Sequence, residues 1–228
     1  MKFDKEFEQV LCGSIIGDGY LDMNGRAKNP LYYEQHSIKQ KNYLNYKINI
    51  FKKYFRIKKY NYLSKSGFSK NKEYITFRTN RDYKFLDYYS IFYPNGKKKI
   101  SEEILNKLNW LGIAVWFCDD GYYDYRTKMI YLAQNKIFHK NSIKFFQNKG
   151  FYFKSHYLNM RLNVRESKNF IEKIKPHILK MPKCMHYKIG LDKIKEININ
   201  NQKKQYYHNY YQNKQKIALI KSRGWSRL

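Results

Sequence analysis

The sequence is poor in acidic residues, cysteine and proline, and these shortages exclude several classes of protein. Its 18 Asp and Glu stand against 46 Lys and Arg, which leaves a formal charge of +28 on 228 residues. Three widely spaced cysteines do not suit a secreted disulfide scaffold, and no Cys or His pair has the spacing of a structural zinc site. No run of about 18 apolar residues is present, so we expect no membrane span. The first residues lack an apolar core, so we expect no signal or transit peptide.

The positive charge is concentrated in two long blocks. Residues 35–72 contain eleven Lys and Arg and no acid, and residues 125–165 contain nine and no acid. Both blocks interleave aromatic and aliphatic residues with the bases, which is typical of folded segments rather than of a basic tail. A polyanionic partner offsets the self-repulsion of such a chain, and the pattern favours nucleic acid over a membrane surface.

Two parts of the chain repeat one another. The segment Asp18–Asp22 (DGYLD) recurs as Asp120–Asp124 (DGYYD), and each copy follows an apolar run with helical character. Further on, residues 74–80 match residues 157–163, and both alternate in polarity like a strand with one wet face. A helical pattern follows each of these strands. The repeat predicts two similar halves in one chain.

The predicted fold class is α+β, with two αββαββα halves related by a pseudo-two-fold axis. We expect the two apolar helices to pack at the centre and the antiparallel sheets to form a saddle for DNA. We divide the chain into a first half (1–94), a linker (95–109), a second half (110–190) and a basic C-terminal tail (191–228). The tail is interpreted either as a mobile basic segment or as a docked accessory helix. Predicted helices cover residues 7–16, 40–54, 81–93, 110–118, 139–148 and 166–178, and predicted hairpins cover 20–36, 57–80, 122–135 and 151–164.

The two apolar runs with their acids carry a family resemblance. Residues 11–19 (LCGSIIGDG) and 113–121 (IAVWFCDDG) resemble the motif of the LAGLIDADG homing endonucleases. The second copy is similar to the form found in the single-chain omega-type intron endonucleases of mitochondria. The resemblance extends over about residues 5–190. Two copies, each followed by the same pattern of strands and helices, are far more specific than one nonapeptide.

Asp18 and Asp120 are the predicted catalytic and metal-binding acids. An acid at the C-terminal end of a helix lies beside free carbonyl groups and the negative end of the dipole, which suits a hard cation. Small residues on the first motif helix would let the two helices pack closely and bring both acids to the axis: Cys12, Gly13 and Gly17. The resemblance implies Mg²⁺ as cofactor, with Mn²⁺ as a substitute, and metal-binding backbone carbonyls at Gly17 and Asp119. The alternative is that both acids are ordinary Asp-Gly turn residues.

The resemblance also implies one lysine near each acid. Lys98 and Lys188 match these positions, although Lys97 or Lys99 could replace Lys98. Such a lysine would order the attacking solvent or stabilise charge that develops on the phosphate. The alternative is an ordinary contact with a DNA phosphate.

Basic and amide side chains on the predicted hairpins are candidates for DNA contacts. Arg and Lys suit guanine edges, and Gln suits adenine. For each residue a phosphate contact is at least as plausible as base reading. The candidates are Arg26, Lys28, Gln35, Arg78, Arg126, Lys128, Gln134 and Arg161.

These observations predict a monomeric, metal-dependent, site-specific DNA endonuclease that acts on double-stranded DNA. The resemblance implies short 3′ overhangs and a role in intron mobility. An intron-encoded maturase, which would bind intron RNA and assist splicing, is the main alternative, and a DNA-binding protein without turnover is a weaker one. Residue types with AT-rich codons are abundant while Ala and Pro number four each, which indicates an AT-rich genome such as that of an organelle. The resemblance implies a mitochondrion, with a chloroplast as the alternative.

Overall fold

The structure is a computed structural model that describes residues 3–25, 27–65 and 71–191. The predicted tail beyond residue 191 and the candidate Arg26 lie outside the described residues. Residues 1–190 form one compact unit. The first half contains α1 (Lys5–Ile16), β1 (Tyr20–Asp22), β2 (Leu31–Ser37), α2 (Lys41–Phe51), β3 (Ile57–Leu63), β4 (Glu73–Thr79) and α3 (Leu86–Phe92). The short α4 (Glu102–Asn106) follows it. The second half contains α5 (Trp110–Asp120), β5 (Gly121–Asp124), β6 (Met129–Ala133), α6 (His139–Gln147), β7 (Lys154–His156), β8 (Asn159–Arg161) and α7 (Val164–Ile178).

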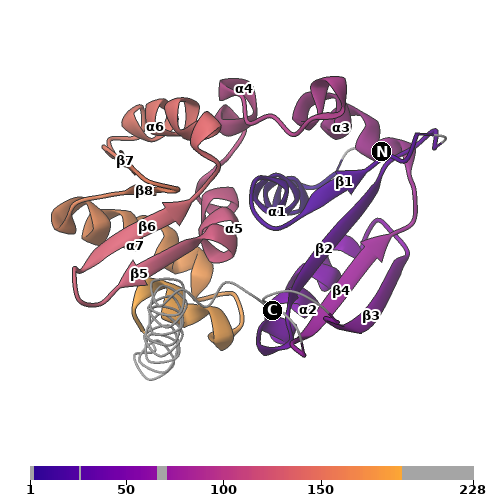
Figure 1. The fold of residues 1–228 in the computed structure, drawn as a ribbon, viewed down its shortest axis with the longest axis horizontal. Helices are drawn as coiled ribbons and strands as arrows, with labels where there is room; N and C mark the ends of the chain where they lie inside the picture. The colour runs from indigo at the N-terminus through magenta and orange to yellow at the C-terminus, as the bar shows by residue number, and fades with distance from the viewer. Residues whose placement is uncertain (1–2, 26, 66–70, 192–228) are drawn as a thin grey trace, which may run out of the picture. The chain divides into compact units, whose positions relative to one another are not determined.

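The predicted α+β architecture with two related halves is confirmed. Each half holds a four-stranded antiparallel sheet, with the orders β1-β2-β4-β3 and β5-β6-β8-β7, which are the same order in both halves. In each half a helix precedes the sheet, a helix lies between the two hairpins and a helix follows (Figure 1). The repeat in the sequence therefore corresponds to a repeat of the fold.

The motif helices α1 and α5 lie side by side between the two sheets (Figure 1). Their backbones come close together at Gly13 and Gly112, because a Cβ atom on Gly13 would lie 2.4 Å from the carbonyl oxygen of Gly112. Only glycine fits such a backbone contact. The predicted close packing through small residues is thus present, and Gly112 contributes as much to it as the first motif does.

Local signals define where several helices begin. The Asp4 carboxylate accepts a hydrogen bond from the N–H of Phe7 at the start of α1. Asn109 caps α5 in the same way, and the Ser101 hydroxyl accepts from the N–H of Ile104 at the start of α4. These caps satisfy N–H groups that have no partner inside the helix. The helix expected over residues 81–93 differs: a 3-10 turn occupies 83–85, and α3 starts at Leu86.

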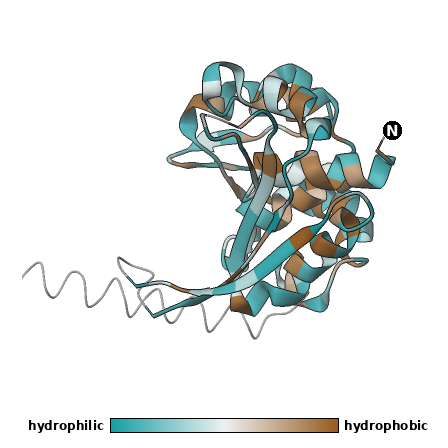
Figure 2. Cartoon of the chain, turned by 90° about the vertical axis from the view of Figure 1, so that its right-hand side faces the viewer, coloured by the Kyte–Doolittle hydropathy of each residue, from teal (hydrophilic) through white to brown (hydrophobic). Residues whose placement is uncertain are grey.

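Apolar residues form one continuous core beneath the sheets. In the second half Trp116 and Phe146 stack with their ring centroids 5.5 Å apart, and Phe170 packs against Phe146. Hydrophilic and hydrophobic residues occur on both helices and strands, as expected for elements that bury one face (Figure 2). Among the described residues, the helices are too short or too polar to cross a membrane. The core holds the ends of α1 and α5 in place, and these ends carry both motif acids.

Candidate functional site

Both motif acids lie at the C-terminal ends of the motif helices. Asp18 follows α1 and has a side chain 40% exposed, whereas Asp120 is the last residue of α5 and is largely buried. Burial, together with the negative charges of Asp18 and Asp119, raises the pKa of Asp120 to about 7. The carboxyl groups therefore lie within electrostatic reach of one another.

The two predicted lysines occupy corresponding places at the helix ends. The Lys98 nitrogen donates to the carbonyl of Gly17 over 3.3 Å, at the end of α1. The Lys188 nitrogen donates to the carbonyl of Gly121 over 2.6 Å and to that of Asp119 over 3.4 Å, at the end of α5. Burial lowers the pKa of both lysines, and the nearby acids oppose this shift. Each helix end thus combines one carboxylate with one partly desolvated ammonium group.

A buried polar network surrounds the remaining acid of the second motif. The Asp119 carboxylate, which is 0% exposed, accepts hydrogen bonds from Lys47 and from the hydroxyl of Tyr43, each over 2.9 Å. Lys47 also donates to Glu34 over 2.5 Å, and His36 lies 2.6 Å from the same carboxylate oxygen. Burial raises the pKa of Glu34, but Lys47 and His36 outweigh it and lower the pKa to about 2. Burial lowers the pKa of Lys47 and of His36, but their acidic neighbours outweigh it and raise both.

Sequence reasoning missed this network. Lys47 lies in the acid-free block 35–72, whose positive charge favours a nucleic-acid partner, yet its side chain is wholly buried. One signal was available: Glu34 alternates with Tyr32 and His36, so all three share the inward face of β2. A buried carboxylate requires a buried cation nearby.

The face of each sheet opposite the helices carries the same row of side chains. In both sheets a cross-strand row contains Tyr, Tyr, Arg and Lys in that order. The rows are Tyr20, Tyr33, Arg78 and Lys58 in the first half, and Tyr122, Tyr131, Arg161 and Lys154 in the second. The tyrosine rings in each row lie 4.9 Å apart. The register therefore places the predicted Arg78 and Arg161 at equivalent positions, and adds two lysines and four tyrosines that the sequence did not indicate.

The remaining predicted DNA contacts divide into two groups. Lys28, Arg126 and Lys128 are exposed and lie in the turns of the first hairpin of each half. Gln35 lies two residues from Tyr33 on the same face of β2, and its side-chain oxygen accepts a hydrogen bond from the Tyr33 hydroxyl over 3.1 Å. The three basic side chains are therefore exposed next to the strands, and Gln35 lies on the face that carries the row of the first half.

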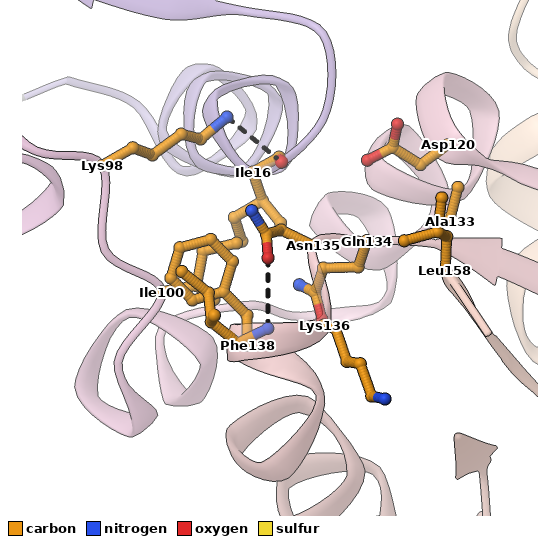
Figure 3. A pocket seen from close by; sticks show the side chains of 11 residues that line it. Ile16, Lys98, Ile100, Asp120, Ala133, Gln134, Asn135, Lys136, Phe138 and Leu158 are labelled. Carbon is orange, nitrogen blue, oxygen red and sulfur yellow. Dashed lines mark hydrogen bonds between the residues drawn. The ribbon is translucent and has the colours of Figure 1, made fainter. Parts of the chain in front are cut away.

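Gln134 lies elsewhere. It lines a cavity of about 650 Å³ together with Asp120, Lys98 and Phe138 (Figure 3). Both polar atoms of its side-chain amide are buried and have no hydrogen-bond partner among the described residues. The structure thus associates Gln134 with the second motif acid rather than with the row that contains Arg161.

The donor set at the helix ends suits a hard divalent cation. The carboxylates of Asp18 and Asp120 and the carbonyls of Gly17 and Asp119 are all oxygen donors. Burial and, after it, the negative charges of Asp18 and Asp119 raise the pKa of Asp120, and a bound cation would offset both effects. The carbonyls that accept from Lys98 and Lys188 keep a second lone pair. The residues therefore fit the cation that the sequence predicts.

Comparisons with known proteins agree with this geometry. The profile of the LAGLIDADG DNA endonuclease family matches residues 8–183. The chain is 31% and 30% identical over 126 residues to Protein RecA of Mycolicibacterium flavescens and of Mycobacterium shimoidei. These matches cover 55% of this chain but only 28% of the length of those relatives.

Among solved structures, the fold is similar to that of the homing endonuclease I-WcaI bound to its DNA recognition sequence. The TM-score is 0.74 at 21% identity, and the match covers 84% of this chain and 89% of that one. At this identity the likeness shows a shared fold. The family profile, by contrast, spans both motif helices and most of both halves, and we conclude that the chain belongs to the LAGLIDADG DNA endonuclease family.

Proposed function

We propose that the protein is a metal-dependent, site-specific endonuclease that cuts both strands of a long DNA site. The observation that carries this proposal is that each of two adjoining helix ends holds one acid and one lysine, Asp18 and Lys98 at α1 and Asp120 and Lys188 at α5. Two corresponding sets of groups at one pseudo-two-fold axis match the two strands of a duplex. Family membership supports the reaction class.

Each cut is the hydrolysis of a phosphodiester. Asp18 and Asp120, with the carbonyls of Gly17 and Asp119, would hold Mg²⁺ or Mn²⁺. When bound, the cation lowers the pKa of its water and stabilises charge on the leaving oxygen. Water attacks phosphorus, the bond to the 3′ oxygen breaks, and that oxygen takes up a proton. The products are a 3′ hydroxyl and a 5′ phosphate, with short 3′ overhangs when the two cuts are staggered across the minor groove.

Lys98 and Lys188 act on the developing charge. Burial makes each ammonium a stronger acid and a stronger hydrogen-bond donor than a surface lysine. Both point at the ends of the motif helices, where the scissile phosphates would lie. We assign them to stabilising the phosphate charge or to ordering the attacking water.

The rows on the two sheets would bind the DNA. Arg78 and Arg161 present guanidinium groups for guanine edges or phosphates, and Lys58 and Lys154 extend the same positive rows. Because one chain contains both halves, a monomer suffices to cover an asymmetric site. The biological role we propose is intron mobility in an organelle, most simply a mitochondrion, supported by the AT-rich residue usage.

The decisive experiment is DNA cleavage. The protein is incubated with Mg²⁺ and a duplex that spans the intron-free form of its own insertion site, beside an Asp18→Asn/Asp120→Asn double variant. We expect a staggered double-strand cut that the double variant loses while it still binds the duplex. Tight binding without cutting in either Mg²⁺ or Mn²⁺ would contradict the nuclease function. If the protein binds DNA without cutting it but supports splicing of the intron, it is a maturase.

A further inference from the structure

The most unusual charged group outside the two acid–lysine pairs is Lys47. Its side chain is 0% exposed, and lysine is almost never fully buried unless it is paired. It lies on α2 of the first half, and one of its two partners, Glu34, lies on β2 of the same half. The other partner is Asp119, at the end of α5 in the second half. A single buried ammonium therefore joins the two halves directly beneath the active site.

Asp119 connects Lys47 to the reacting centre. One oxygen of its carboxylate accepts from the backbone N–H of Asp18 over 3.4 Å, so the side chain supports the turn that carries the first catalytic acid. Its own backbone carbonyl accepts from Lys188, and its neighbour in the chain is Asp120. A displacement of Asp119 would therefore shift both motif acids.

The same cluster could be interpreted as a further cation site. Ligand atoms of Asp18, His36 and Asp119 all lie within 4.8 Å of one another. However, Lys47 and Tyr43 already donate to the Asp119 oxygens. The two ring nitrogens of His36 face Glu34 at 2.6 Å and Asp18 at 3.6 Å. The ammonium of Lys47 thus provides the positive charge that a cation would provide there.

Among the described residues, the arrangement is present in one motif and not in the other. Asp119 corresponds to Gly17 in the first motif, and a Cβ atom on Gly17 would lie 2.6 Å from the Cβ of Asp119. In the second half, the position that corresponds to Lys47 is occupied by Phe145, which is also buried. Glycine in one motif makes room for the aspartate of the other, and one lysine holds it.

We propose that Lys47 is a positioning residue for the two motif acids and that it acts through the side chain of Asp119. It fixes the Asp18 turn and the end of α5 at their working separation, and it keeps the Asp119 carboxylate from recruiting a cation of its own. This proposal rests on the nuclease function proposed above. Removing a group that supports metal-binding residues in this way lowers activity by on the order of 10- to 100-fold.

The test compares Lys47→Met, Asp119→Asn and the double variant with the matched control Phe145→Met. Each protein is first bound to DNA in Ca²⁺, so that only folded, bound complex is counted, and Mg²⁺ then starts a single turnover. We expect Lys47→Met and Asp119→Asn each to slow cleavage by on the order of 10- to 100-fold. The double variant should be no slower than the slower single variant, because both changes break one connection. Phe145→Met should cleave at the wild-type rate per bound complex.

A second measurement does not depend on cleavage. The thermal midpoint of each DNA complex is followed as Ca²⁺ is titrated. Lys47→Met removes the ammonium group that neutralises the carboxylates of Asp119 and Glu34, so these carboxylates can attract Ca²⁺ instead. The Ca²⁺-dependent change in thermal midpoint should therefore be half complete at a lower Ca²⁺ concentration than in the wild type. The double variant and Phe145→Met should need more Ca²⁺ than Lys47→Met does.

The proposal is overturned if the wild type cuts and Lys47→Met cuts bound DNA equally fast. It is also overturned if the losses of the two single variants multiply in the double variant. A wild type that does not cut counts against the nuclease function instead. In that case the Ca²⁺ titration alone tests the proposal. The role of Lys47 is rejected if Lys47→Met and the wild type reach half of the Ca²⁺ effect at the same Ca²⁺ concentration.

Discussion

The two halves share a backbone plan but differ in what they bury beneath their motif acids. The first half buries Glu34 and Lys47, and the corresponding positions in the second half are Leu132 and Phe145. The first half thus supports its neighbour's helix end with an ion pair, whereas the second half fills the same layer with apolar packing. A cavity beside Asp120 accompanies the apolar version.

This difference shows that the fold and the active site impose separate demands. The Glu34–Lys47 ion pair and the apolar residues Leu132 and Phe145 both fill the space between a sheet and its helix. Either pair is therefore sufficient for packing within one half. Only the polar version reaches across to the other half, through Asp119. The two acids also differ in environment: Asp18 is 40% exposed, and Asp120 is largely buried. The following predictions test how far this difference extends.

The largest expected effect is the loss of either motif acid. Asp18→Asn and Asp120→Asn should each slow double-strand cleavage by on the order of 10³-fold, because a bound metal contributes several kcal/mol at about 1.4 kcal/mol per tenfold. Single-turnover cleavage of bound DNA measures this effect. If one variant still nicks one strand rapidly while the other does not, the halves work independently. Equal loss on both strands means that they share one centre.

The lysines come next. Lys98→Met and Lys188→Met should each lower the cleavage rate by about 10²-fold, as for other groups that stabilise charge in a reaction. Lys188→Met should also lower the thermal midpoint more than Lys98→Met does, since Lys188 makes the shorter contact, 2.6 Å to the Gly121 carbonyl. Lys97→Met and Lys99→Met are the matched controls, and we expect both to cleave at the wild-type rate. Full activity of Lys98→Met would transfer its role to one of these neighbours.

Asp120→Asn should stabilise the metal-free protein at neutral pH. The raised pKa means that ionised Asp120 destabilises the folded state, and this effect grows as pH rises from about 4 to about 7. The variant should gain on the order of 2 kcal/mol over the wild type at pH 8, and the gain should vanish near pH 4. Urea unfolding with EDTA at both values measures it. Asp18 is the more exposed acid, so Asp18→Asn should increase the free energy of unfolding by less than Asp120→Asn does. An equal increase would show that the two acids do not differ in environment.

Arg78→Ala and Arg161→Ala probe the part of the molecule in which the halves agree. Each should weaken DNA binding by about 1–3 kcal/mol if it reads a base, or lower the salt slope of binding by about 1 if it contacts a phosphate. Because the two residues occupy the same place in equivalent rows, we expect similar losses for both. Binding isotherms at several salt concentrations provide the comparison. A loss confined to one variant would show that the duplex contacts the two sheets differently.

Much of the fold was predictable from the sequence because it is encoded twice. The repeated Asp-Gly-Tyr segments and the paired strands 74–80 and 157–163 indicated both halves, and the structure has the same strand order in each. The local cap at Ser101 was also predictable, since the N-cap signal is short-range. The helix ends then place Asp18, Asp120, Lys98 and Lys188 together.

What could not be predicted depends on contacts between distant segments. Lys47 has the sequence context of a surface base, and only the pairing of α2 with the end of α5 shows that it is buried against Asp119. Gln134 was predicted to contact DNA because it lies at the end of a hairpin strand. In the structure it lines the cavity beside Asp120. Residues on edges and helix ends are positioned by the partner element, which a single sequence does not reveal.

The Gly17 and Asp119 pair also limits how such proteins can be recombined. Two copies of the first half would place Lys47 opposite a glycine and leave its ammonium without a carboxylate. Two copies of the second half would set two aspartates where the structure has room for one, given the 2.6 Å approach at position 17. A chimera of related chains would therefore have to exchange Gly17, Lys47 and Asp119 together, so the halves of this protein are complementary parts rather than interchangeable modules.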